Sequence, residues 1–172
     1  MHLKLDSCDV RSLRREDAES LAAHANNRDV WINLRDGFPH PYGRADAESF
    51  IEHCLRTPET AFAISLEDEA VGAIGFVLGG DVERLSAELG YWLGESFWGR
   101  GIMTAAVGAV TEYAIREHGL VRVFATPFAG NEASVCVLEK SGYVLEGVMR
   151  RSAIKDGKII NKLLYAFVAD DD

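Results

Sequence analysis

A strand, a glycine turn and a long helix are predicted in direct succession near the middle of the chain. Residues 89–93 form an apolar run that is typical of a buried strand. The turn behind this run holds Gly99 and Gly101, and apolar residues recur at helical spacing from Ile102 onward. Gly119 is a natural residue to end this helix. We therefore expect the rest of the chain to pack around this unit.

The predicted turn has the chemistry of an anion-binding site. Glycines let the backbone approach a ligand closely, and the first N–H groups of a helix point outward at the positive end of its dipole. Arg100 lies between the two glycines and adds a full positive charge. A Gly-x-Gly pair alone is often only a tight turn, but the Walker and Rossmann fingerprints are both missing here. We interpret the turn as a diphosphate site.

The remaining patterns predict strands and helices in mixed order, with Asn131 as a helix cap and a hairpin turn at Asp156-Gly157. The expected architecture is α+β, a mixed, twisted sheet of about seven strands with helices on both faces. The strands are predicted at 8–13, 61–66, 70–78, 89–93, 121–126, 143–154 and 158–168, and the helices at 18–25, 29–34, 45–55, 102–118 and 131–140.

Composition narrows the class of protein. A length of 172 residues suits a single domain over 1–172. The three cysteines are odd in number and widely spaced, which favours a reducing, cytoplasmic compartment, and no metal-ligand spacing is present. No apolar run is long enough to span a membrane. The net charge of −9 argues against nucleic acid and suits cationic acceptors such as amines, although acidity can also serve solubility alone.

The run over residues 87–104 resembles the acetyl-CoA pyrophosphate loop of the GNAT N-acetyltransferase superfamily. Its pattern is most similar to the branch of bacterial ribosomal-protein N-terminal (alanine/serine) acetyltransferases. The general superfamily pattern is Gln/Arg-x-x-Gly-x-Gly/Ala, whereas Trp98 and Met103 stand at its first and last positions here, as in that branch. The resemblance covers nearly the whole chain. It implies the GNAT fold with a mostly antiparallel sheet, acetyl-CoA as cosubstrate, and a homodimer.

The resemblance also implies a cofactor-binding set. In the family, the strand before the turn pairs with the pantetheine amides, one of its N–H groups faces the thioester carbonyl, and an asparagine on a later helix binds the pantetheine arm. An alternative for the aromatic members of the set is a role in the core and in anchoring the loop. The set is Tyr91, Trp92, Leu93, Trp98, Gly99, Arg100, Gly101, Ile102, Met103, Thr104, Asn131 and Ser134.

Acetyl transfer needs a base for the amine and an acid for the leaving thiolate. The tyrosine acid of most GNAT enzymes lies seven residues after the asparagine, and Leu138 occupies that position here, so Ser134 is the expected acid. Alternatively, Asn131 is only a cap and Ser134 an ordinary first-turn residue. Glu88 is the expected base, because apolar neighbours favour the protonated form of a carboxyl group; its alternative is a solvated strand end. His40 and His118 are weaker candidates.

These residues predict an N-acetyltransferase that passes the acetyl group directly to a primary amine in a ternary complex. A protein or peptide α-amine is the preferred acceptor, because its pKa of about 7.7–8.0 leaves an appreciable neutral fraction near pH 7. The alternatives are a small-molecule amine (a polyamine, an amino acid or an aminoglycoside) and a catalytically silent acyl-CoA-binding module. The loop from Phe38 to Tyr42 either lines the acceptor pocket or is a rigid surface loop.

Overall fold

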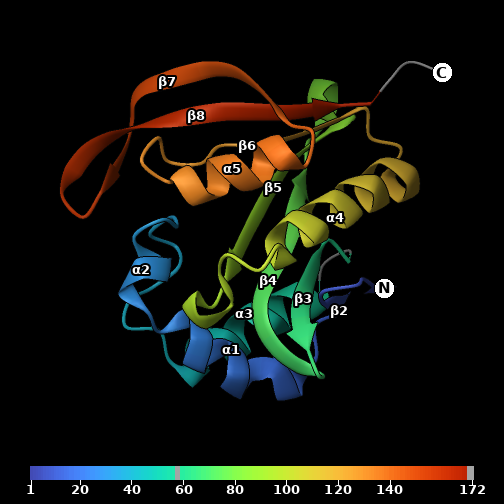
Figure 1. Cartoon of the computed structure of the whole chain (residues 1–172), viewed down its shortest axis with the longest axis vertical. Coiled ribbons are helices and arrows are strands. Elements are labelled where there is room, and N and C mark those ends of the chain that lie inside the picture. Colours follow the sequence, from blue (N-terminus) through green and yellow to red (C-terminus); the bar gives the residue numbers. More distant parts are fainter. Residues whose placement is uncertain (57–58, 170–172) are drawn as a thin grey trace. The chain divides into compact units, whose positions relative to one another are not determined.

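The computed structural model describes residues 1–56 and 59–169, which form two compact units (Figure 1). The first unit comprises Met1–Gly75 and Tyr91–Ala106, and the second comprises Phe76–Gly90 and the residues from Val107 onward. The chain passes between the units inside three regular elements, which are β4 (Glu69–Leu78), β5 (Ser86–Leu93) and α4 (Ile102–His118).

The first unit contains an antiparallel sheet in the order β1-β2-β3-β4, with the end of β5 beside β4, where the Gly94 N–H donates to the Val71 carbonyl at 2.8 Å. Apolar faces of α1 and α3 pack into one core with side chains of β3 and β4, including Leu21, Ile51 and Ala63. The elements of this unit are β1 (His2–Lys4), β2 (Asp9–Ser12), α1 (Ala18–Ala25), α2 (Arg28–Trp31), α3 (Arg44–Arg56) and β3 (Ala61–Leu66).

A buried ion pair joins β2 to the start of α1. The Arg11 guanidinium donates to both oxygens of the Asp17 carboxylate, at 2.7 and 2.8 Å, and both side chains are almost fully buried. The Asp17 carboxylate raises the pKa of Arg11. Removal of one partner of such a pair leaves an uncompensated buried charge and costs about 3–5 kcal/mol.

The second unit contains strands in the order β5-β6-β8-β7. The start of β5 runs parallel to β6 (Arg122–Ala125), whereas β6 and β8 (Lys158–Val168) are antiparallel, as are β8 and β7 (Val144–Lys155). The helix α5 (Glu132–Lys140) is attached to β8 by the Tyr165 hydroxyl, which donates to the Glu139 carboxylate at 2.9 Å.

The predicted α+β architecture with a mixed, mostly antiparallel sheet is confirmed. The described residues contain eight strands where about seven were expected, because β1 is only three residues long and too short to stand out as a pattern. The predicted helix at 29–34 is only the short α2, and β5 begins at Ser86 rather than residue 89. The polar residue Thr111 of α4 is buried, and its hydroxyl is hydrogen-bonded to the Tyr143 hydroxyl at 2.7 Å.

Candidate active site

The predicted diphosphate turn connects β5 to α4 and contains two glycines in the left-handed region. Gly99 has φ +72° and Gly101 has φ +77°, values that side-chain-bearing residues rarely adopt. A Cβ placed on either glycine would meet no atom within 4 Å. The glycines are therefore needed for the backbone path of the turn, and the space in front of them is open.

Side chains of the turn fix its shape by bonding to its own backbone. The Trp98 indole N–H donates to the Leu93 carbonyl at 2.8 Å, and the Arg100 guanidinium donates to the Ser96 carbonyl at 2.7 Å. The guanidinium also lies 5.4 Å from the centroid of the Phe97 ring. The turn is thus held by its own residues, and Arg100 remains exposed beside the glycines.

The first helical hydrogen bond of α4 runs from the Ala105 N–H to the Gly101 carbonyl at 3.1 Å. The N–H groups that precede it belong to the first turn and point out of the helix start. Ile102 and Met103 are buried, which anchors this helix start in the first unit. The structure thus brings the whole predicted run from Tyr91 to Thr104 into one strand, turn and helix start.

The end of β5 packs tightly against β4 and against the loop at 38–42. A Cβ on Gly72 would lie 2.4 Å from the Trp92 carbonyl oxygen, so only glycine allows this approach. The Phe38 ring stacks on Tyr42 at 4.6 Å and meets the Trp92 ring edge-on at 5.6 Å. Burial raises the pKa of Tyr42 to about 12. Phe38 and Tyr42 pack against the core, whereas His40 and Pro41 between them are exposed.

In the second unit, Asn131 caps α5 as predicted. Its side-chain oxygen accepts a hydrogen bond from the Ser134 N–H at 3.1 Å, which places the half-buried Ser134 in the first turn of the helix. Leu138, at the position where the family pattern has tyrosine, is fully buried. The hydroxyl of Tyr143, in the turn after α5, is bonded to Thr111, and that of Tyr165, on β8, is bonded to Glu139.

Glu88 lies on β5 directly opposite Phe124 in the parallel ladder. Its carboxylate accepts a hydrogen bond from the Thr126 hydroxyl at 2.9 Å, and its side chain is half-buried rather than fully solvated. Thr126, which follows β6, was not predicted as a site residue, because only the pairing of β5 with β6 brings it close to Glu88.

The predicted residues therefore fall into two groups. The strand end, turn and helix start are assembled in the first unit, whereas Glu88, Asn131 and Ser134 belong to the second. Among residues 1–56 and 59–169, no group of three or more His, Cys, Asp or Glu side chains could hold a metal ion. No helix in this described part is long and apolar enough to cross a membrane.

Comparisons with known proteins agree with this geometry. The model of the acetyltransferase (GNAT) domain family matches residues 9–144. The chain is 30% identical over 173 residues to the probable N-acetyltransferase YjcK of Bacillus subtilis, which covers 95% of this chain and 94% of that protein. It is 32% identical over 111 residues to the ribosomal-protein-serine acetyltransferase of Escherichia coli, which covers 63% and 60% of the two chains.

Among solved structures, RimL, a ribosomal L7/L12 alpha-N-protein acetyltransferase in complex with coenzyme A, superposes on this chain with a TM-score of 0.86. The match covers 100% of both chains at 21% sequence identity. This likeness extends the shared fold beyond residue 144, over the C-terminal hairpin of β7 and β8.

Proposed function

The chain belongs to the GNAT family of acetyltransferases, and from this premise we propose that it acetylates the α-amine of a protein or peptide. It is an acetyl-CoA-dependent N-acetyltransferase. The acceptor and the roles of single residues are the proposed part. The relatives described as acetylating ribosomal proteins support the choice of a polypeptide acceptor.

The conformation of the turn at 98–101 carries the proposal for the cosubstrate. Both glycines present bare backbone to open space, and the helix dipole and the exposed Arg100 favour an anion there. A diphosphate of acetyl-CoA suits these features in size and charge. In this proposal Ile102, Met103 and Thr104 supply N–H groups, and Trp98 supports the turn through its bond to Leu93. Tyr91 and Trp92, on the strand before the turn, pair with the pantetheine arm.

In the proposed reaction the amine nitrogen attacks the thioester carbonyl carbon, and the carbon–sulfur bond breaks as the tetrahedral intermediate collapses. A backbone N–H near the end of β5 stabilises the oxyanion. The amine gives its proton through a water to Glu88, which Thr126 orients, and the leaving thiolate takes a proton from Ser134. Glu88 then releases its proton to water and Ser134 regains one from water, so that one proton has passed from the amine to the thiol. Because the Asn131 side-chain oxygen is used in capping, its amide N–H group is the one offered to pantetheine.

An α-amine is deprotonated more easily than a lysine amine, so it needs a weaker base. Its pKa of about 7.7–8.0 leaves part of it neutral near pH 7, whereas a lysine amine near 10.4 is almost wholly charged. Glu88 is half-buried and accepts a hydrogen bond from Thr126, which suits a base of moderate strength. The overall charge of −9 further attracts a cationic terminus.

Paired peptides test this proposal. One peptide has a free α-amine and no lysine, and its partner has a blocked terminus and one lysine; release of free thiol from acetyl-CoA measures the rate. We expect the free-terminus peptide to react at least about 10-fold faster near pH 7, because its neutral fraction is larger.

Other acceptors in the same screen identify the alternatives. If polyamines, amino acids or aminoglycosides outpace every free terminus, the enzyme acts on a small-molecule amine. If acetyl-CoA binds and no amine reacts, the protein is a silent acyl-CoA-binding module.

A further inference from the structure

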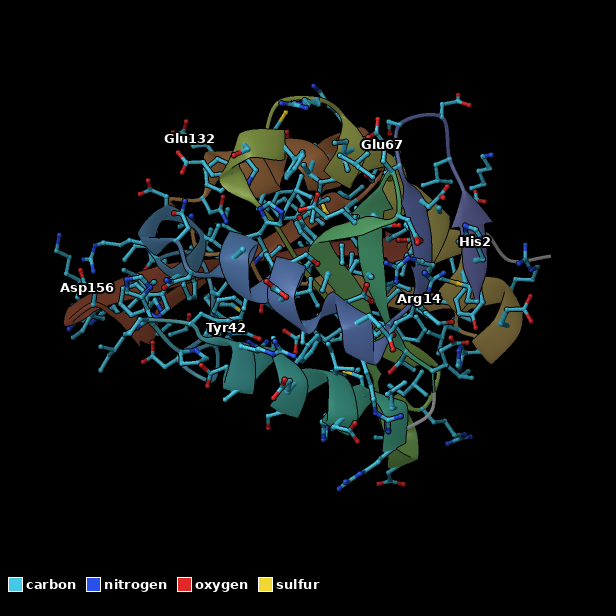
Figure 2. The ribbon with its side chains drawn as sticks, turned by 90° about the horizontal axis from the view of Figure 1, so that it is seen from below. His2, Arg14, Tyr42, Glu67, Glu132 and Asp156 are labelled. Carbon is cyan, nitrogen blue, oxygen red and sulfur yellow. The ribbon has the colours of Figure 1, made fainter. Side chains whose placement is uncertain are left out.

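The edge of the second unit carries an uneven concentration of positive charge. Five of the chain's 18 basic residues lie between positions 150 and 162, against the single acidic residue Asp156, although the whole chain has a net charge of −9. This segment comprises the end of β7, the hairpin turn and the start of β8. Figure 2 labels Asp156 at the turn, where side chains project outward from the ribbon. The overall charge therefore hides a basic region.

A wide bulge in β7 displays two of these cations. Met149 pairs with Lys162 and Ala153 pairs with Ile160, so residues 150–152 of β7 lie opposite Asn161 alone. Two side-chain bonds hold the bulge: the Asn161 side-chain oxygen accepts the Arg151 N–H at 2.8 Å, and the Ser152 hydroxyl donates to the Met149 carbonyl at 2.7 Å. We call Arg150, Arg151, Ser152 and the adjacent Lys162, which pairs with Met149, the basic bulge.

The two arginines of the basic bulge have no partner for their guanidinium groups within residues 1–56 and 59–169. Every other arginine of the chain has an ion pair, a hydrogen bond, a ring contact or another electrostatic partner. Arg151 also has φ +51°, a strained value that the bulge imposes. Adjacent exposed guanidinium groups are suited to bind carboxylates in a bidentate manner.

The surroundings favour a polypeptide as the source of those carboxylates. β7 lies at the edge of the sheet, and Val148, Met149 and Ile154 are exposed along it. An extended peptide can use both the unpaired backbone groups and the apolar side chains of such an edge. An RNA is disfavoured as the ligand, because the basic bulge offers few cations for phosphate contacts and the net charge of −9 of the whole chain repels phosphates. A second copy of this chain that paired through β7 would bring the like charges of two bulges together. The bulge would also interrupt the hydrogen-bond ladder between the two β7 edges.

Asn161 also ties the basic bulge to the predicted acid helix. Its backbone carbonyl accepts the Ala129 N–H at 3.0 Å, two residues before Asn131 caps α5. Two residues after Asn161, the Leu163 N–H donates to the Pro127 carbonyl at 2.9 Å. One segment of β8 therefore fixes both the bulge and the loop that leads to Ser134.

We propose that the basic bulge binds an acidic segment of the acceptor polypeptide, downstream of the α-amine that is acetylated. This inference rests on the proposed function and makes its substrate class narrower: a cationic terminus followed by carboxylates.

The test uses two peptides with the same first two residues and free α-amines. One continues with Asp and Glu and the other with Asn and Gln. We expect the wild-type enzyme to prefer the acidic peptide about 10-fold in kcat/KM, the effect of two exposed charge pairs of about 0.7 kcal/mol each. R150Q/R151Q should remove the preference, and raised salt should weaken it.

The control variant R84Q/R116Q removes the same charge from other exposed sites of the second unit and should keep the preference. An equal loss in this control, or no preference in the wild type, overturns the inference. Binding of the labelled acidic peptide, measured by fluorescence anisotropy, is a readout that needs no turnover.

If no α-amine peptide is acetylated but anisotropy shows bulge-dependent binding of the acidic peptide, the proposed function fails and the docking surface stands. If R150Q/R151Q instead abolishes binding of an RNA oligomer, or dissociates a dimer in sedimentation, and leaves the peptide preference intact, the docking inference is wrong.

Discussion

The cofactor turn of the first unit and the Glu88–Ser134 group of the second unit are built in different ways. The turn depends on backbone conformation: two glycines at positive φ, an outward-facing helix start, and side chains that bond to its own carbonyls. The second group depends on side chains from separate elements, such as the bond from Thr126 to Glu88. A backbone site tolerates changes of side chain but needs residues that accept positive φ, whereas a side-chain site should lose function one group at a time.

The largest effect is expected where the turn has no tolerance. Gly101→Asp places a carboxylate where the diphosphate is proposed to lie, and it should weaken acetyl-CoA binding at least about 1000-fold, to below detection by calorimetry. Gly101→Asn is the matched control, since asparagine has the same shape and also accepts positive φ. The two variants separate the charge from the backbone strain. Unchanged affinity in a folded Gly101→Asp protein would refute the diphosphate assignment.

Ser134→Ala tests the side-chain group. We expect turnover to fall about 10- to 1000-fold, the range of a general acid, while acetyl-CoA affinity stays within a few-fold. Ser141→Ala removes another hydroxyl of the same helix region, bonded to the Val137 carbonyl at 2.9 Å, and should leave turnover almost unchanged. Affinity lost without a loss of turnover per bound cofactor would make Ser134 a binding residue instead.

The third prediction concerns the packing beneath the end of β5. The phenol of Tyr42 is neutral in both folded and unfolded chains below pH 10, but between pH 10 and about 12 only the unfolded chain ionises. Because of Tyr42, the free energy of unfolding should therefore fall by about 2–3 kcal/mol as the pH rises from 10 to about 12. Urea unfolding at pH 9 and at pH 12 measures the loss, and Tyr42→Phe should reduce it by that amount. Equal losses in both proteins would show that Tyr42 is not the cause.

The sequence predicted the parts of the molecule that local patterns determine. The strand–turn–helix unit, the cap at Asn131 and the hairpin turn at Asp156 each depend on residues that are close together in the sequence. The bond between Thr126 and Glu88 joins residues 38 apart in the sequence, and that between Thr111 and Tyr143 joins residues 32 apart. Such bonds exist only after strands and helices have packed, so no spacing in the sequence could reveal them.

The bulge in β7 was unpredicted for the same reason. Residues 149–153 contain no glycine or proline that would mark an irregular strand, and only their pairing with β8 shows that residues 150–152 face one residue.

The smallest effect is expected at Thr126, whose role depends on Glu88. Thr126→Val keeps the shape of the side chain and removes the hydroxyl that donates to the Glu88 carboxylate, so kcat should fall about 3- to 10-fold, the effect of one hydrogen bond of about 1 kcal/mol. Thr126→Ser retains the hydroxyl and should stay near the wild-type rate. The decisive measurement is a double-mutant cycle: if Thr126 acts by orienting the base, then Thr126→Val should have no further effect on kcat in a Glu88→Gln background. A loss of equal size in both backgrounds would show that Thr126 supports the β5–β6 pairing independently of Glu88, and the second group would then be less a network of side chains than the structure indicates.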